Sequence, residues 1–245
     1  MQIYKKKPKG ALLLPRFSHW KLRMKHSKRA EEAAHQLIQG SRLKTEFFVM
    51  SGLSGILAAL GILLNSTAIL IGAMVLAPLL NPVLAFAAGI FLFHRGLIVY
   101  ATKSFFGGLL CIIAVSALLA KGLLLTGHAL EENLMDATVR FQQYNSYILI
   151  AAFVSGFAAV YSWLRPMNNL NLVGVAIAVS LIPFVSFLGM LIGAEKFEAL
   201  NLLAPAFSFN LILIILGAMV AYLVLGFSRA RKEVNSSIAH SKTGE

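Results

Sequence analysis

Charged residues are scarce in this chain, and cysteine is almost absent. Only 13% of the 245 residues are Asp, Glu, Lys or Arg, whereas 58% are hydrophobic. A soluble domain carries roughly 25% charged residues, so this composition excludes an ordinary soluble fold and indicates an integral membrane protein. The single cysteine, Cys111, lies in an apolar run, which excludes a disulfide framework and a thiolate metal cluster.

Acidic residues are missing from the interior of every long apolar run. A proton relay or a carboxylate-bound sodium site at the bilayer centre therefore has no residue to form it. The six histidines are scattered over termini and turns, and no spacing of metal ligands occurs. No nucleophile is paired with a base either, so the sequence predicts no enzyme, no cofactor and no metal.

Six apolar runs are long enough to cross a membrane, where about 20 residues at 1.5 Å each match a hydrocarbon core of roughly 30 Å. They cover residues 47–64, 67–93, 98–120, 147–164, 172–194 and 203–227. The sequence therefore predicts an all-α integral membrane protein with six spans in one domain, 45–228. Only Asn65 and Ser66 separate the first two runs, so these two spans pack antiparallel.

Basic residues flank the runs unevenly. With alternating spans and both termini inside, all but three of the 22 Lys and Arg face the cytoplasm. The exceptions are Lys121, Arg140 and Lys196. Cytoplasmic segments of membrane proteins carry such an excess of positive charge. We therefore predict a multi-pass protein of the cell membrane, with both termini cytoplasmic.

Residues 1–44 hold twelve Lys and Arg and form a basic cytoplasmic arm. Small and apolar residues recur at helical spacing between positions 30 and 38, which predicts an interfacial helix that meets anionic lipid headgroups. The net charge of +12 would suggest nucleic acid in a soluble protein, but beside membrane spans it sets orientation. We predict no nucleic-acid binding. Residues 229–245 form a polar cytoplasmic tail.

Two prolines interrupt the second run, Pro78 and Pro82, with Asn81 between them. A proline inside a helix removes a backbone donor and clashes with the carbonyl one turn back, which costs about 3 kcal/mol or more. Hydrocarbon offers no water to the freed carbonyl, so another group must pair with it. As one straight helix the run would also be roughly 40 Å long. The sequence therefore predicts a broken second span.

A second stretch echoes this pattern. Gly174 begins an apolar run that reaches Pro183, just as Gly72 begins the run that reaches Pro78 and Pro82. Interrupted helices at corresponding places in two halves point to a transporter-like site. The halves, about 45–120 and 147–228, hold three spans each, and an odd number makes them inverted repeats. We predict that the second and fifth spans are both broken at prolines.

The candidate solute-binding or ion-binding residues are those at the two breaks and the few polar side chains near span centres or turns. They are Asn65, Ser66, Pro78, Asn81, Pro82, Ser180, Pro183 and Asn210. On a structural interpretation, Asn81 and Ser180 pair with the backbone groups that the prolines disturb. On a functional interpretation, freed carbonyls favour cations and hydroxyls, half-helix N-termini favour anions, and together they form a small polar site.

We consider four of the other serines inside predicted spans. They are Ser104, Ser116, Ser155 and Ser186. A serine in a helix commonly donates to the carbonyl one turn back, so we expect these hydroxyls to bond within their own helices. Gly189 and Gly193 have the spacing of a helix-packing pair, which allows a homo-oligomer.

Three motifs resemble a known family. Residues 61–66 (GILLNS) and 71–82 (IGAMVLAPLLNP) are similar to the first signature of the prokaryotic "domain of unknown function 389" family. Residues 174–183 (GVAIAVSLIP) resemble its second signature, and Asn210 with residues 225–227 resembles its last span. Asn81 stands where the family has a small residue, and Phe184 where a second proline is common. The resemblance covers roughly residues 47–227 and implies a prokaryotic multi-span membrane protein, but neither a substrate nor a reaction.

We predict that the protein is a channel or carrier for a small polar solute or ion, with its site between the broken second and fifth spans. The alternative is a membrane scaffold or regulatory protein that acts through its basic cytoplasmic arm.

Overall fold

The computed structural model describes residues 41, 43–127, 130–142, 146–164, 181–225 and 227. Over this part of the chain the fold is all-helical, as predicted, and contains no strand. The helices are α2 (Thr45–Leu63), α3 (Thr67–Leu76), α4 (Leu80–Phe91), α5 (Arg95–Leu125), α6 (Glu131–Gln142), α7 (Ser146–Leu164), α9 (Leu181–Gly193) and α10 (Phe197–Val224).

Four of these helices, α2, α5, α7 and α10, are long and apolar enough to cross a membrane. Helices α3 and α4 together form one more candidate span, bent by 55° at the residues between them. Helix α9 is apolar but has only 13 residues, and the residues before it lie outside the described part. The described residues thus contain four or five candidate spans, compatible with a multi-pass membrane protein. The basic arm up to residue 40 and the polar tail 229–245 lie outside them.

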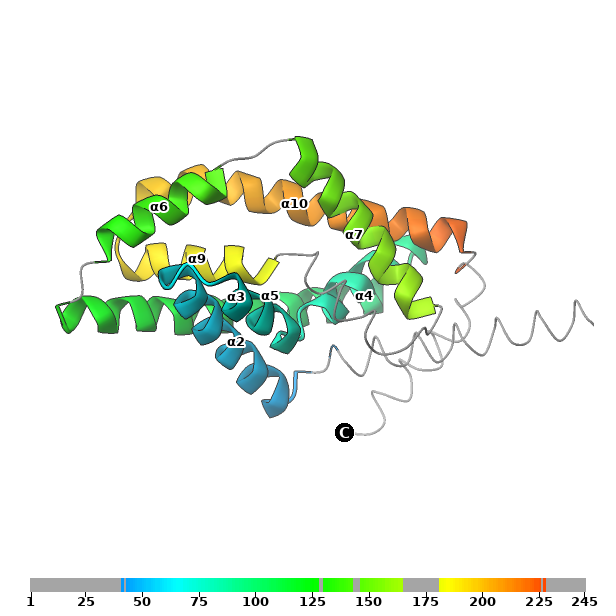
Figure 1. The fold of residues 1–245 in the computed structure, drawn as a ribbon. Coiled ribbons are helices and arrows are strands. Elements are labelled where there is room, and N and C mark those ends of the chain that lie inside the picture. The colour runs from blue at the N-terminus through cyan, green and yellow to red at the C-terminus, as the bar shows by residue number, and fades with distance from the viewer. Residues whose placement is uncertain are drawn as a thin grey trace, which may run out of the picture.

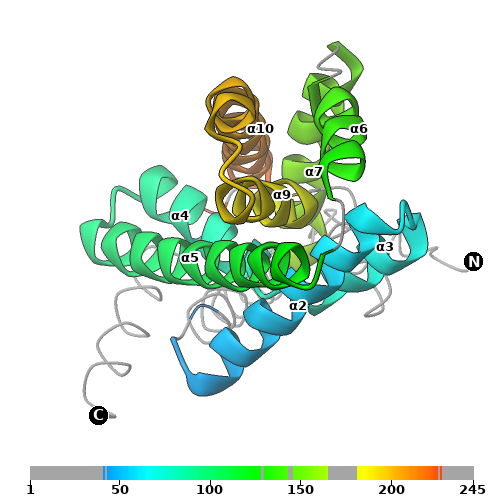
Figure 2. The ribbon, with the colours of Figure 1, turned by 90° about the vertical axis from the view of Figure 1, so that its left-hand side faces the viewer.

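Helices α2, α5 and α9 run in the same direction. Phe47 of α2 lies against Gly108 of α5, and Gly55, further along α2, lies against Ile112, further along α5. The residue numbers in contact therefore rise together along both helices. Two glycines of α9 meet α5 in the same ascending order. Helix α3 is antiparallel to α2 across a short turn, and the colours of Figure 1 show α7 and α10 running against α9 as well. Figure 2, seen end on, places α9 between α5 and α10.

The core consists of three apolar clusters along the bundle. The first joins α4, α5, α7 and α10 and includes the fully buried Leu84 and Ile214. The second joins α6, α9 and the start of α10 around Phe187. The third surrounds the bend between α3 and α4 and includes Leu79 and Val185. The bend therefore lies inside the packed core rather than at its edge.

Helix α6 occupies the longest segment between predicted spans, which the sequence marked only as a connection. Its apolar face, with Leu134, Ala137 and Phe141, packs into the second cluster, to which α2, α9 and α10 also contribute. The ring of Phe141 stacks on Phe187 at 4.9 Å between centroids and meets Phe184 edge-on at 5.1 Å. The opposite face is exposed, so α6 is an amphipathic helix, and it lies alongside the first part of α10 (Figure 1).

Candidate functional site

The second span breaks at the first of its two prolines. Helix α3 ends at Leu76, Ala77 is extended, and Pro78 lies in the turn that leads into α4. The amide of Ala77 still donates to the carbonyl of Ala73 at 3.3 Å, but Pro78 has no N–H to offer the carbonyl of Met74. The helical ladder of α3 therefore stops here.

Pro82 has a different role. It lies in the first turn of α4, which begins at Leu80, where an N–H would have no partner within the helix. Pro82 is buried, and it is compatible with the new helix rather than disruptive. One proline thus ends a helix and the other is accommodated at the start of the next.

A side chain of α2 binds to the broken end of α3. The hydroxyl of Ser54 donates to the carbonyl of Ala73 at 2.7 Å, and both residues are fully buried. This contact supplies a second donor to the carbonyl of Ala73, which also accepts from the amide of Ala77. The carbonyl that Pro78 deprives of a donor is that of Met74, so the pairing predicted for Asn81 and Ser180 stays a prediction. Around it, the aliphatic side chains of Leu79, Ile182 and Val185 close the core.

Two further hydroxyls join three helices next to this point. Ser116 of α5 and Ser186 of α9 lie 2.9 Å apart, and both reach the carbonyl of Gly55 of α2, at 3.3 and 3.2 Å. All three residues are buried. The prediction that these two serines bond within their own helices is wrong, because glycine at position 55 exposes its carbonyl to both neighbours.

The other two serines follow the expected pattern. Ser155 donates to the carbonyl of Ala152, three residues earlier in α7, at 2.8 Å. Ser104 reaches the carbonyl of Tyr100 in its own helix at 3.1 Å, and it also donates to the carbonyl of Ser41, which precedes α2.

Ser51 is the one buried side chain in the described residues whose hydroxyl has no hydrogen-bond partner. It lies on the same face of α2 as Ser54 and Gly55, at spacings of three and four residues. We call Ser51, Ser54, Ser116 and Ser186, with the carbonyls of Gly55 and Ala73, the hydroxyl cluster. Its members come from α2, α3, α5 and α9, and every polar atom in it is an uncharged oxygen.

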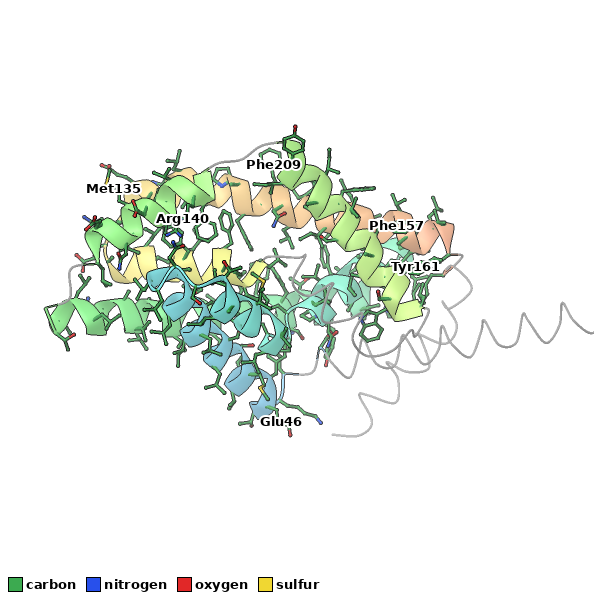
Figure 3. All side chains as sticks on the ribbon, viewed as in Figure 1. Glu46, Met135, Arg140, Phe157, Tyr161 and Phe209 are labelled. Atoms are coloured by element: carbon green, nitrogen blue, oxygen red, sulfur yellow. The ribbon has the colours of Figure 1, made fainter. Side chains whose placement is uncertain are left out.

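The predicted residues Asn65 and Ser66 are far from this cluster. They form the turn between α2 and α3, about 16 Å along α2 from Ser54 at 1.5 Å per residue. Asn65 has a positive φ of 48°, and its side-chain oxygen accepts a hydrogen bond from the guanidinium of Arg140. Figure 3 shows Arg140 on the side of α6 that faces this turn. Asn65 therefore joins this turn to α6, and neither Asn65 nor Ser66 is part of the break.

The remaining predicted residues lie nearer to it. Asn81 is half-buried in the first turn of α4. Pro183 is buried in the first described turn of α9, and the helix continues from it without interruption to Gly193. Asn210, 7% exposed, lies one turn along α10 from Phe207, whose ring packs against the cluster at the break. Ser180, and any break before Leu181, lies outside the described residues.

Sequence reasoning missed Ser51 and Ser54. The signal that could have found them is a stripe of small residues at positions 51, 54, 55 and 58, which repeats at helical spacing within the first span. Such a stripe marks the face on which other helices approach closely in a membrane. Within the described residues no group of His, Cys, Asp and Glu could hold a metal ion.

The fold and the site together define a helical, multi-pass type of membrane protein with a bent span and buried hydroxyls beside the bend. Residues 74–227 match the family model described as "Domain of unknown function (DUF389)", and the chain belongs to that family. The resemblance seen in the sequence motifs is thereby confirmed.

One curated relative, Uncharacterized protein MJ0678 of Methanocaldococcus jannaschii, is 31% identical over 196 residues. The match covers 78% of this chain and 58% of the relative, so the chain spans less than two thirds of that protein's length. No solved structure matches the chain.

Proposed function

We propose that this protein passes a small polar solute or ion across the membrane through a site beside the broken second span. The observation that carries the proposal is the 55° bend at residues 77–79, set against buried hydroxyls of α2. A proline inside a helix costs about 3 kcal/mol or more, and a residue other than proline at position 78 would avoid that cost. Interrupted helices in transporters expose backbone groups to their solutes.

The proposal includes six spans arranged as two inverted repeats. Its support is directional: α2, α5 and α9 run one way, whereas α3–α4, α7 and α10 run the other. Six alternating crossings produce this order if α9 is the described end of a fifth span over residues 172–194. The two halves, about 45–120 and 147–228, then contribute the second and fifth spans to one site.

Under this proposal the protein lies in the cell membrane, and both of its termini are in the cytoplasm. The support is the excess of Lys and Arg in the segments that six crossings place inside. The basic arm, 1–44, then meets anionic lipid headgroups, which attract clustered Lys and Arg at a membrane surface.

Flux in reconstituted vesicles tests the proposal. We would measure light scattering of vesicles challenged with urea or glycerol, and ion flux under sodium chloride and potassium chloride gradients. At least one probe should cross faster than it crosses protein-free vesicles. Asn81→Ala and Ser180→Ala should reduce that flux while insertion into the membrane is unchanged. Ser208→Ala is the matched control, because Ser208 is exposed on α10 and bonds only to Ala204 of its own helix.

A chain lacking residues 1–40 distinguishes the alternative function. If the protein acts as a scaffold or regulator, removing the arm abolishes function while Asn81→Ala and Ser180→Ala leave it intact. Under the transport proposal the shortened chain still conducts. No flux above protein-free vesicles for any of the four probes would contradict the proposal.

A further inference from the structure

The hydroxyl of Ser51 needs a partner that the described protein atoms do not supply. Its side chain is fully buried on the inner face of α2, and its oxygen makes no hydrogen bond. Buried hydroxyls are nearly always paired, because an unpaired one has lost its bonds to water. A serine in a helix commonly donates to the carbonyl one turn back, and Ser51 does not.

The neighbours of Ser51 place it level with the break. On the same face of α2, Phe47 packs in one cluster with Leu79, while Ser54 bonds to the carbonyl of Ala73. On this face of α2, Ser51 lies between Phe47 and Ser54. Because α2 and α3 are antiparallel, Ser51 is therefore opposite the residues between Ala73 and Leu79. Those residues are the end of α3 and the turn that follows it.

This location is rich in acceptors and poor in donors. The hydroxyl of Ser54 donates to the carbonyl of Ala73. The hydroxyls of Ser116 and Ser186 bond to each other and to the carbonyl of Gly55. The last carbonyls of α3 form the negative end of its dipole, and Pro78 brings no N–H to them. The lone pairs that remain favour a ligand that carries positive charge.

The charge of that ligand is limited by what surrounds it. No acidic residue lies in the interior of the described spans, and the acids Glu46 and Glu198 fall in the first turns of α2 and α10. Calcium and magnesium sites rely on carboxylates, whereas hydroxyl and carbonyl oxygens at a half-helix end suffice for a monovalent ion. We propose that Ser51, Ser54 and the carbonyl end of α3 bind a monovalent alkali cation, Na⁺ or K⁺. This inference rests on the proposed function, since it names the ligand class at the same break.

Thermal unfolding of the full chain in detergent tests this site without any measurement of flux. Sodium chloride or potassium chloride would be titrated against choline chloride at constant ionic strength. A bound ion raises the unfolding midpoint in a saturable way, and choline does not replace it. Ser51→Ala and Ser54→Ala should lose the cation-dependent shift. Ser155→Ala should keep it, because Ser155 is a buried serine that bonds only within α7.

A second readout separates binding from packing. In choline alone Ser51→Ala should unfold at the same midpoint as the unchanged protein or higher, because the substitution removes an unpaired buried hydroxyl. If Ser54→Ala does not fold, Ser51→Ala alone decides the question.

Two results would overturn the inference: equal midpoints in Na⁺, K⁺ and choline, or a saturable shift that persists in Ser51→Ala. The hydroxyl would then be bridged by water only. Cation binding without flux in vesicles would contradict the proposed function alone, and flux without a cation-dependent shift would contradict this inference alone.

Discussion

Single glycines set how closely the helices approach one another. A Cβ atom on Gly156 of α7 would collide with the carbonyl oxygen of Ile214, and one on Gly217 of α10 would collide with the carbonyl oxygen of Phe153. Both obstacles are backbone, which cannot rotate away as a side chain can. Close contact through small residues is the usual way in which helices pack in a membrane.

We therefore expect Gly156→Ala to lower the free energy of unfolding by about 1–3 kcal/mol, since extra atoms in a packed core displace backbone. Chemical or thermal unfolding in detergent measures the change. Gly72→Ala is the matched control: nothing lies within 4 Å of a Cβ there, and alanine favours a helix by about 1 kcal/mol over glycine. Equal losses in both variants would show that the contact between α7 and α10 is not close.

Residue-level bonding is where the sequence predicted least. A serine's hydroxyl can turn to its own helix or to a neighbour, and the choice depends on how the helices are rotated against each other. Ser116 and Ser186 bond across helices because Gly55 leaves its carbonyl uncovered, whereas Ser155 bonds within α7. The residue type is the same, so only the packing distinguishes them.

Among the elements, α6 shows how a polar connection acquires structure. It lies alongside the first part of α10 with Phe141 against Phe184 and Phe187, and Arg140 of the same helix donates to Asn65. In Figure 3, Met135 points away from the bundle on the opposite face of α6.

Phe141→Ala should detach α6 and lower the free energy of unfolding by about 1–3 kcal/mol, as each of two ring contacts contributes about 0.5–1.5 kcal/mol. Faster limited proteolysis within 131–142 would report the detachment directly. Met135→Ala serves as the control, because Met135 is 72% exposed and touches no partner ring. If both variants resist protease equally, α6 is held by its ends and not by this ring.

Proline affects these helices in three ways. Pro78 ends α3, Pro82 sits in the first turn of α4, and Pro205 lies inside α10, which continues through it. The sequence identified the first two as a break, yet only the structure shows that they act at opposite sides of it. Pro205 is not at a break: α10 continues through it, with Leu203 before it and Phe207 after it packed in the second cluster.

Pro205→Ala should therefore raise the free energy of unfolding, by up to about 3 kcal/mol, because it restores a donor inside a continuous helix. The midpoint of thermal unfolding in detergent measures the gain. Pro82→Ala should bring no gain, since an N–H in the first turn has no helical partner and the buried ring would be lost. A gain of the same size at position 82 would contradict this account of the two prolines.

For the molecule as a whole, composition was enough to predict an all-α membrane protein, because an apolar chain in lipid must satisfy its backbone within helices. The second span was predicted as broken, and α3 and α4 bear that out. The number of spans and their inverted repeat stay predictions, since α9 is described only from Leu181 onward. The hydroxyl cluster needed the structure, because its hydrogen bonds join residues up to 131 positions apart in the sequence.

Six crossings with both termini inside predict where reporters will work. A fluorescent protein fused after residue 245 should fluoresce in the cytoplasm, and alkaline phosphatase fused there should be inactive. Alkaline phosphatase fused after residue 127, in the turn that follows α5, should instead be active. Activity at both fusion points would exclude an inside C-terminus and an odd number of spans between residues 127 and 245.

The bonds shared by α2, α5 and α9 also limit which parts of the bundle can move. Gly55 accepts from Ser116 and Ser186 at once, so sliding any one of these three helices would cut contacts to both others in the oily interior. The bent pair of helices α3 and α4 is bonded to these three helices close to its bend, where the hydroxyl of Ser54 donates to the carbonyl of Ala73. Under the proposed transport function, a movement that opens a path across the bilayer would therefore rotate α3 and α4 about their bend, while α2, α5 and α9 stay in place.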